Sequence, residues 1–310
     1  MAKAYQSSAP GSIMLMGEHA VLRDKLALVG AVDKRMTATL TPQENQHVDI
    51  FSELGEYHGT LHQLEDSTVF RFVLAVIKLY HAKITSGFRL DIHSGFSSTV
   101  GLGSSAAVVV ATLACLQQWC DHINHQQLFL DARSIIQKVQ GRGSGADVVA
   151  SVYGGIVAYR MEPLLIKKSE HIFDIALIYT GYKTPTPEVI KVVDQRVQSD
   201  PKKYARLFNE MNDCSEKAWQ AIQQKNWTKL GKFMQQHQHA QTQLGVCDQK
   251  TAELLHLLQQ NPNVLGCKIS GSGLGDCVVS LTTSSFDWHH QNFMRIDATL
   301  SATGVTYESQ

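Results

Sequence analysis

A glycine- and serine-rich turn that leads into a long apolar stretch restricts the fold of this chain more than any other feature. The turn is Gly101-Leu102-Gly103-Ser104-Ser105, and the apolar run after it reaches Leu116. Glycines let a backbone approach a ligand closely, and a helix N-terminus offers unpaired N–H groups and a positive dipole end. We therefore predict a phosphate-binding loop followed by a helix over 105–119. The alternative from these residues alone is a tight turn in which Ser104 or Ser105 caps the helix.

The usual nucleotide-binding fingerprints do not describe this turn. Neither Gly-x-x-x-x-Gly-Lys-Ser/Thr nor a dinucleotide fingerprint with its following acidic residue is present. A Walker-type or a dinucleotide-binding protein is therefore disfavoured.

The overall composition favours a two-domain protein with a small ligand. The chain has 310 residues, 44% of them hydrophobic, and domains average about 100–200 residues. Its 28 basic and 28 acidic residues balance, which disfavours binding of nucleic acid or membrane through charge. The longest apolar run is too short to span a membrane, and the N-terminus lacks the apolar core of a secretory signal. We expect a cytoplasmic protein, and we expect its scattered cysteines to be reduced.

Hydrophobic periodicity divides the chain into two parts. The first part alternates as strands over 36–40 and 89–93 and carries a helical pattern over 69–80, behind Asp66 or Ser67 as a cap. The second part begins between 160 and 170. It is expected to contain a strand over 172–179, a loop over 180–187, helices over 188–197, 203–224, 227–244 and 251–259, and a last strand over 277–281.

Two further glycine-bearing segments end in polar residues. Residues 10–21 form a Pro-Gly turn and an apolar strand that ends in Gly17-Glu18-His19, which suggests a strand end that points into a site. Residues 268–276, Lys-Ile-Ser-Gly-Ser-Gly-Leu-Gly-Asp, carry three glycines in five positions and favour close approach to another group. Alone, each segment also fits a structural histidine, a surface carboxylate or an ordinary hairpin.

Together the three segments resemble, in order and rough spacing, the motifs of the GHMP kinases, the superfamily of galactokinase, homoserine kinase, mevalonate kinase and phosphomevalonate kinase. The Gly-Glu-His-Ala-Val stretch at 17–21 is most similar to the mevalonate kinases. The resemblance implies a two-domain α+β fold with the active site between the domains. Residues 1–165 would form a ribosomal-protein-S5-like, ATP-binding N-terminal domain, and residues 166–310 a ferredoxin-like C-terminal domain.

The same resemblance assigns roles to individual residues. Asp147, in Gly143-Ser144-Gly145-Ala146-Asp147, matches the aspartate proposed as the catalytic base in mevalonate kinases; a turn aspartate is the alternative. ATP and Mg²⁺ are the expected cofactors. Expected to bind ATP are Gly101, Leu102, Gly103, Ser104, Ser105, Ala106, Gly271, Ser272 and Gly273. Expected to bind the acceptor are Glu18, His19, Asp147 and Lys183, and Ser105 is the expected Mg²⁺ ligand.

Three positions depart from the mevalonate kinase pattern. Ser12 stands where those enzymes usually carry a lysine, and Ile136 and Gln137 stand where they carry a magnesium-binding glutamate. Asp276 replaces a further glycine in the third motif. A carboxylate near phosphate is unfavourable unless it binds a metal or points away.

The expected activity is therefore ATP-dependent phosphorylation of a small-molecule hydroxyl, with mevalonate as the first acceptor to consider. Phosphomevalonate kinase is the alternative within the family, and it would need additional basic residues from Lys25, Arg142, Lys183 and Lys268. A nucleotide-binding protein without turnover is the alternative from another class, favoured by Ser12. His237 and His239 are predicted to lie on a solvated helix face, and a homodimer is left open.

Overall fold

Two β-sheets organise the chain, which the computed structural model describes at residues 3–97, 101–284 and 286–309. The first has eight strands in the order β12-β1-β2-β5-β3-β4, with β6 paired to β2 and β7 paired to β6. Only β3 and β5 run parallel within it. Its strands are β1 (Tyr5–Met16), β2 (Ala27–Pro42), β3 (His47–Ser52), β4 (Gly55–Thr60), β5 (Phe88–Ser94), β6 (Ile156–Arg160), β7 (Leu165–Ser169) and β12 (Thr306–Ser309).

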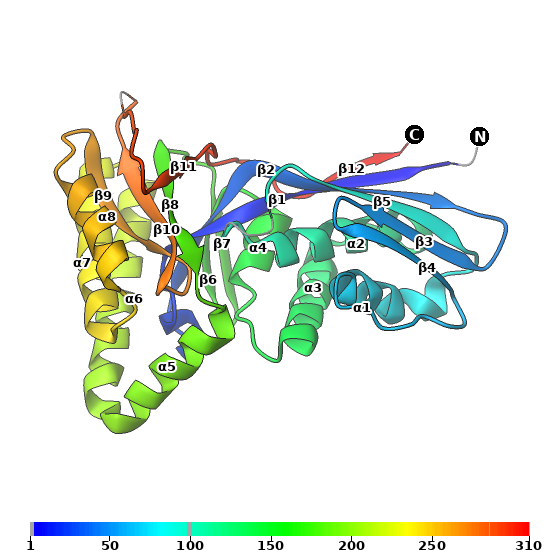
Figure 1. The fold of residues 1–310 in the computed structure, drawn as a ribbon, viewed down its shortest axis with the longest axis horizontal. Helices are drawn as coiled ribbons and strands as arrows, with labels where there is room; N and C mark the ends of the chain where they lie inside the picture. The colour runs from blue at the N-terminus through cyan, green and yellow to red at the C-terminus, as the bar shows by residue number, and fades with distance from the viewer. Residues whose placement is uncertain (1–2, 98–100, 285, 310) are drawn as a thin grey trace.

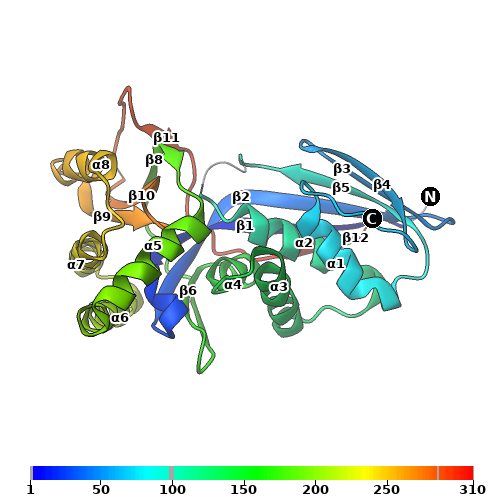
Figure 2. The same cartoon turned by 60° about the horizontal axis from the view of Figure 1, so that its bottom comes forward.

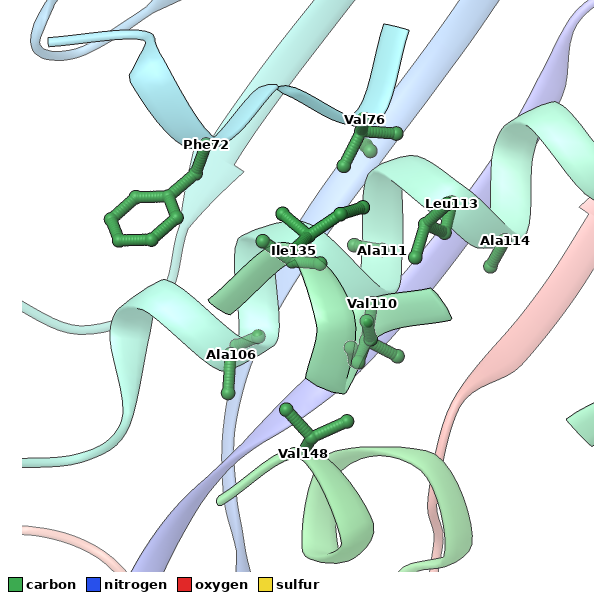
Figure 3. Close-up of a cluster of buried hydrophobic side chains, with 14 of the residues drawn as sticks. Phe72, Val76, Ala106, Val110, Ala111, Leu113, Ala114, Ile135 and Val148 are labelled. Atoms are coloured by element: carbon green, nitrogen blue, oxygen red, sulfur yellow. The ribbon is translucent and has the colours of Figure 1, made fainter. Parts of the chain in front are cut away.

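Four helices cover one face of this sheet (Figure 1). They are α1 (Arg71–Tyr80), α2 (Ser104–Cys120), α3 (His125–Gln140) and α4 (Ala146–Tyr153). Helix α2 is apolar nearly all round because it lies between the sheet and the other three helices. Figure 3 shows Val110 of α2 among side chains from the other helices, including Ile135 and Val148. This packing fixes the N-terminus of α2 relative to that of α4.

The second sheet, β11-β8-β10-β9, carries the remaining long helices. Its strands are β8 (Ile175–Lys183), β9 (Val264–Ser270), β10 (Gly275–Thr282) and β11 (Met294–Ile296), and the helices are α5 (Thr186–Ser199), α6 (Pro201–Gln223), α7 (Trp227–Leu244) and α8 (Gln249–Gln259). Short 3₁₀ turns cover Ala20–Arg23 and His81–Lys83.

Alternation along β8 and β10 ties the two sheets together. Ile178 and Val278 pack against α8, whereas Leu177 and Val279 pack against Ile13 of β1 and its neighbours. Strand β1 therefore packs against the second sheet where the two halves of the molecule join (Figure 2). Among the described residues, no helix is long and apolar enough to cross a membrane.

Most elements predicted from periodicity are confirmed. Helix α7 has the predicted limits, α2 begins one residue earlier, and α1 begins at Arg71 because the chain first makes a turn in which the Ser67 hydroxyl accepts from Phe70 N. The loop predicted over 180–187 is wrong. Strand β8 continues to Lys183 because it pairs with β10, and α5 starts at Thr186.

The C-terminal part of the chain returns to the first sheet. The prediction that 277–281 holds the last strand is wrong, since β11 and β12 follow, and β12 pairs with β1 at the N-terminus. The expected division at 165/166 falls inside β7, which pairs with β6 of the first sheet. We keep a two-part division as a proposal, with its boundary between β7 and β8.

Candidate active site

A pocket of ≈ 570 Å³ opens where the two halves meet. The glycine turn, the start of α4 and the end of β8 all line it, and the third glycine segment closes one side. Its lining includes Gly101, Gly103, Asp147, Lys183, Gly271 and Asp276. The three motifs that are distant in sequence therefore reach one cavity.

The glycine turn is held against β1. Leu102 O accepts a hydrogen bond from Ser12 N at 3.0 Å, and a side chain at Gly11 would place its Cβ 2.8 Å from Leu102 O. Gly103 is the N-cap of α2 in a left-handed conformation, and no described side chain caps the helix. Its first-turn N–H groups therefore face the pocket at the positive end of the helix, which suits a phosphate.

Substitution of Gly103 by alanine should disable this loop. Its φ is +65°, and a Cβ there would lie 2.3 Å from Ser12 Oγ, so an alanine would strain the backbone and displace the Ser12 side chain. We expect Gly103→Ala to weaken ATP binding at least about tenfold, as loss of roughly 1.4 kcal/mol would do. Equilibrium titration with ATP checks this, with Gly141→Ala as the control because nothing lies within 4 Å of a Cβ there. Unchanged ATP affinity in Gly103→Ala would exclude the loop as the phosphate site.

Asp147 lies at the floor of the pocket, in the first turn of α4. Ser12 Oγ donates to Asp147 Oδ1 at 2.8 Å, and a Cβ at Gly103 would contact Asp147 Cβ and Cγ at 3.4 Å. Ser151 Oγ donates to Pro10 O at 2.8 Å and fixes α4 on β1. The aspartate is thus close to the glycine turn, as the resemblance implied.

The surroundings of Asp147 favour a carboxyl that can take up a proton. Asp147 is an exposed residue that lines the pocket. Desolvation by burial raises the pKa of Asp147, the Asp276 carboxylate raises it further, and Ser12 and Lys183 act in the opposite direction. A base with a raised pKa accepts a proton from an alcohol more readily than an ordinary aspartate does.

Lys183 and Asp276 form an ion pair at the other end of the glycine turn. Lys183 Nζ lies 3.0 Å from Asp276 Oδ2, and the lysine side chain is 35% exposed whereas the aspartate is buried. A Cβ at Gly101 would lie 2.3 Å from Asp276 Oδ1, so the carboxylate abuts the turn. The carboxylate at the position of the family glycine therefore does not point away from the expected phosphate site.

A fully buried charge network joins the first and third motifs. Lys268 Nζ donates to Glu18 Oε1 and to the Ile269 carbonyl, and His237 Nε2 accepts from Gly17 N at 2.9 Å. Burial raises the pKa of Glu18 and lowers that of Lys268, while each charge opposes the shift of its partner. Burial and the Lys268 charge lower the pKa of His237 well below its usual value, so the imidazole is neutral and accepts from Gly17.

The prediction of a solvated face for both α7 histidines is therefore wrong for His237. Helix α7 packs on β9, and this contact turns His237 into the interior, whereas His239 is exposed and bonds Gln243. The Gln-rich sequence concealed this, since Gln238 and Gln241 are buried as well. Lys268 is likewise unavailable to an acceptor.

Most of the remaining expected site residues line the pocket. His19 lines the pocket and its Nε2 donates to Ser272 O at 2.7 Å; burial lowers its pKa to about 4. Glu18 reaches the pocket wall but directs its carboxylate to Lys268. Ser104, Ser105, Ala106, Gly271 and Ser272 line the pocket. Leu102 is buried behind the turn, and Gly273 packs against Val246 O, so neither lines the pocket.

The site offers few protein oxygens to a cation. At the position of the family glutamate, Ile136 is an apolar lining residue and Gln137 donates to Gly143 O. No three His, Cys, Asp or Glu side chains are grouped for a metal within the described ranges. Asp276 Oδ1 is buried and has no hydrogen-bond partner among the described residues, and Ser105 lies at the helix N-terminus. This set fits Mg²⁺, which keeps several waters and binds through few protein oxygens together with substrate phosphates.

A second, more apolar pocket of ≈ 710 Å³ adjoins the first. It lies beside α1 and the start of α2, and Arg71, Ser104 and Ser105 line both pockets. Leu54, Phe70, Val73 and Phe96 are among its other lining residues. Sequence reasoning did not find this pocket because its residues come from separate elements without a shared motif.

Comparison with models of known protein families identifies the family of this chain. The GHMP kinases N terminal domain matches residues 69–155, and the GHMP kinases C terminal domain matches residues 218–287. The chain belongs to the GHMP kinases. Its two-domain α+β fold is the GHMP kinase fold, and the pocket that holds the motifs is the cleft between the two halves.

Individual relatives agree with this assignment over most of the chain. A mevalonate kinase from Methanothermobacter thermautotrophicus is 26% identical over 88% of this chain and 89% of its own length. The solved structure of L. major mevalonate kinase in complex with R-mevalonate has a TM-score of 0.75, with 22% identity over 90% of this chain and 87% of that chain. Streptococcus pneumoniae phosphomevalonate kinase, in complex with phosphomevalonate and AMPPNP, has a TM-score of 0.75, with 18% identity over 94% of this chain and 99% of that chain. At these identities the structural likeness shows the fold alone.

Proposed function

We propose that this GHMP kinase transfers the γ-phosphoryl group of ATP to the hydroxyl of a small molecule, with mevalonate as the acceptor. The hydrogen bond between Ser12 and Asp147, next to the uncapped N-terminus of α2, carries this proposal because it brings a proton acceptor beside a phosphate site. The mevalonate kinase relatives support the acceptor. We further propose that the enzyme acts in the cytoplasm, where ATP is available.

The chemistry is a displacement at phosphorus that the protein supports mainly by position and charge. The acceptor oxygen forms a bond to the γ-phosphorus while the bond to the β–γ bridging oxygen breaks, and the electron pair leaves with ADP. Asp147 accepts the hydroxyl proton and Ser12 orients its carboxylate. The first-turn N–H groups of α2 would hold the phosphates. The adjoining apolar pocket has room for the adenine ring of ATP.

Bound Mg²⁺ would neutralise charge on the β- and γ-phosphates. Among this chain's residues, Ser105 would hold it, whereas the nearby Asp276 carboxylate is engaged by Lys183.

Removal of the Ser105 hydroxyl tests its expected role at the metal. We expect Ser105→Ala to raise the Mg²⁺ concentration needed for half-maximal activity, because the ion loses one oxygen ligand. A magnesium titration at saturating ATP measures this, and Ser134→Ala, at an exposed serine of α3 outside the pocket lining, is the matched comparison. An unaltered titration for Ser105→Ala would remove the hydroxyl from the metal site.

Phosphomevalonate is the second candidate acceptor, and one observation favours it. Three basic side chains, Arg71, Arg142 and Lys183, line the pocket, more than one carboxylate needs. Arg142 NH1 lies 2.6 Å from Asp194 Oδ2, and Asp194 also binds Arg23, so part of this charge is already paired. The apolar wall of Val21, Leu22, Ile136 and Ile190 suits the shorter, less charged acceptor.

Release of ADP with a panel of acceptors tests the proposal. The panel contains mevalonate, phosphomevalonate, homoserine and galactose, and ATP affinity is measured in parallel. Turnover highest with mevalonate is the expected result. Turnover highest with phosphomevalonate would reassign the acceptor, and tight ATP binding without turnover on any acceptor would support a binding protein instead.

A further inference from the structure

We propose that Lys183 is the catalytic cation of this kinase: it contacts the γ-phosphoryl group during transfer, and Asp276 holds its ammonium in place. This rests on the proposed function, and it assigns Lys183 to the donor phosphate instead of the acceptor.

The residue at position 12, beside Asp147, supplies no positive charge to the transferring phosphoryl group. The transferring phosphoryl group spreads negative charge over its oxygens, and kinases stabilise it with fixed donors and cations. Position 12, which approaches Asp147 directly, carries a serine in this chain, and its hydroxyl is used on Asp147 Oδ1. Ser12 therefore orients the base but supplies no positive charge.

Few cationic side chains among the described residues lie near enough to the site to supply this positive charge. Lys268 is completely buried and paired with Glu18. Arg142 is more exposed, at 59%, and bonds Asp194. Arg71 lies at the start of α1, where the two pockets adjoin. Lys183 lines the same pocket as Asp147, and its ammonium is held by Asp276 beside the glycine turn. Its charge also lowers the pKa of the Asp147 carboxyl.

The glycine turn lies between the Lys183–Asp276 ion pair and the hydrogen-bonded Ser12 and Asp147. Asp276, with Lys183 at 3.0 Å, abuts Gly101, while Asp147 and Ser12 abut Gly103. A γ-phosphoryl group lying over the turn would therefore have the Lys183 ammonium on one side and Asp147 on the other. An ammonium group has three N–H donors, and Asp276 uses one in the ion pair.

Asp276 is retained at a cost, which indicates a purpose for its charge. Its φ is +69°, a left-handed conformation that favours glycine, and the side chain is only 4% exposed. Within the part of the chain that the structure describes, its buried Oδ1 atom has no hydrogen-bond partner. Since a buried carboxylate is unfavourable without compensation, the ion pair with Lys183 is the contact that accounts for it. We assign Asp276 as a positioning residue.

Moving the positive charge back to position 12 is the decisive experiment. We expect Lys183→Ala to lower kcat by about 10²–10³-fold, as loss of one preorganised charge-stabilising group does, with little change in the KM for the acceptor. In the same background, Ser12→Lys should restore kcat at least about tenfold, because the cation again lies beside Asp147. Lys191→Ala, an exposed lysine on α5, is the matched control and should retain wild-type activity.

The acid limb of the kcat–pH profile separates catalysis from a structural role. Lys183 lowers the pKa of Asp147 and Asp276 raises it. Since Asp147 must be deprotonated to act, Lys183→Ala should move the acid limb to higher pH, whereas Asp276→Asn should move it to lower pH. Asp276→Asn should also lower kcat, because the ammonium loses its anchor. A general loss of packing would not shift the acid limbs of these two variants in opposite directions.

A binding measurement makes the test independent of turnover. ADP with beryllium fluoride mimics the terminal phosphoryl group, and Lys183→Ala should bind it at least about tenfold more weakly while ADP alone binds as before, a difference of roughly 1.4 kcal/mol. If wild-type protein turns over no acceptor, the proposed function fails, and this comparison still decides the role of Lys183. The inference is overturned if Lys183→Ala keeps its kcat and its affinity for the mimic, or if only the acceptor KM rises, which would make Lys183 an acceptor contact.

Discussion

Replacement of Asp147 by asparagine is expected to lower kcat at least about a hundredfold, in line with the contribution of a positioned base, and to leave ATP affinity nearly unchanged. Asparagine has almost the same shape, and its amide oxygen can still accept from Ser12 Oγ, so the floor of the pocket should survive. Its amide cannot take the acceptor proton. The loss should therefore fall on the chemical step, and rapid-quench single turnovers with saturating ATP and acceptor would measure it.

Two comparisons make this result specific. Asp213→Asn removes an exposed carboxylate of α6, outside the catalytic pocket, and should have wild-type kinetics. The ATP dissociation constant of Asp147→Asn, taken from equilibrium binding, should match that of the native protein. If Asp147→Asn kept the native kcat, the carboxylate would have no part in the mechanism. Asp147 would then be a structural turn aspartate, the alternative given by the sequence.

Replacement of Lys268 by methionine is expected to have the largest effect on stability. The side chain is 0% exposed and its ammonium binds Glu18. Methionine fills nearly the same volume without the charge, and it leaves Glu18 buried and unpaired. Removing one partner of a buried ion pair costs about 3–5 kcal/mol of unfolding free energy. Chemical denaturation followed by fluorescence and circular dichroism would measure the change.

A double variant isolates the charge from the packing. Glu18→Gln combined with Lys268→Met removes both charges, and it should recover much of the stability lost in Lys268→Met alone. The control is Lys250→Met, a partly buried lysine outside the network. If Lys268→Met were as stable as the native protein, or the double variant less stable than the single one, the buried pair would not be what joins the first motif to the third.

Local sequence patterns were sufficient for elements whose packing is one-sided and continuous. Helix α7 and the two predicted strands within β2 and β5 keep their periodicity throughout, and the structure confirms them. The patterns failed where pairing with a distant strand extended an element. Strand β8 reaches Lys183 through a polar stretch because β10 supplies its hydrogen bonds, and β12 exists because β1 offers an edge.

The candidate site divides in the same way. The glycine turn and Asp147 could be found from the sequence because each is encoded in a short contiguous motif. Asp276 was noticed only as a departure, and its partner Lys183 was expected in a loop to contact the acceptor. Nothing in the sequence indicates the bond between Ser12 and Asp147, since the two residues are 135 positions apart.

By itself the sequence determined the family, and it suggested the proposed chemistry through a glycine turn before a helix and an aspartate in a recognisable stretch. Only the tertiary structure decided which charges are free to act. Lys268 and Lys183 are both lysines near the third motif, yet one is sealed inside with Glu18 and the other opens into the pocket beside Asp276. Burial and pairing depend on contacts between distant segments, so residue type alone cannot reveal which lysine lines the pocket.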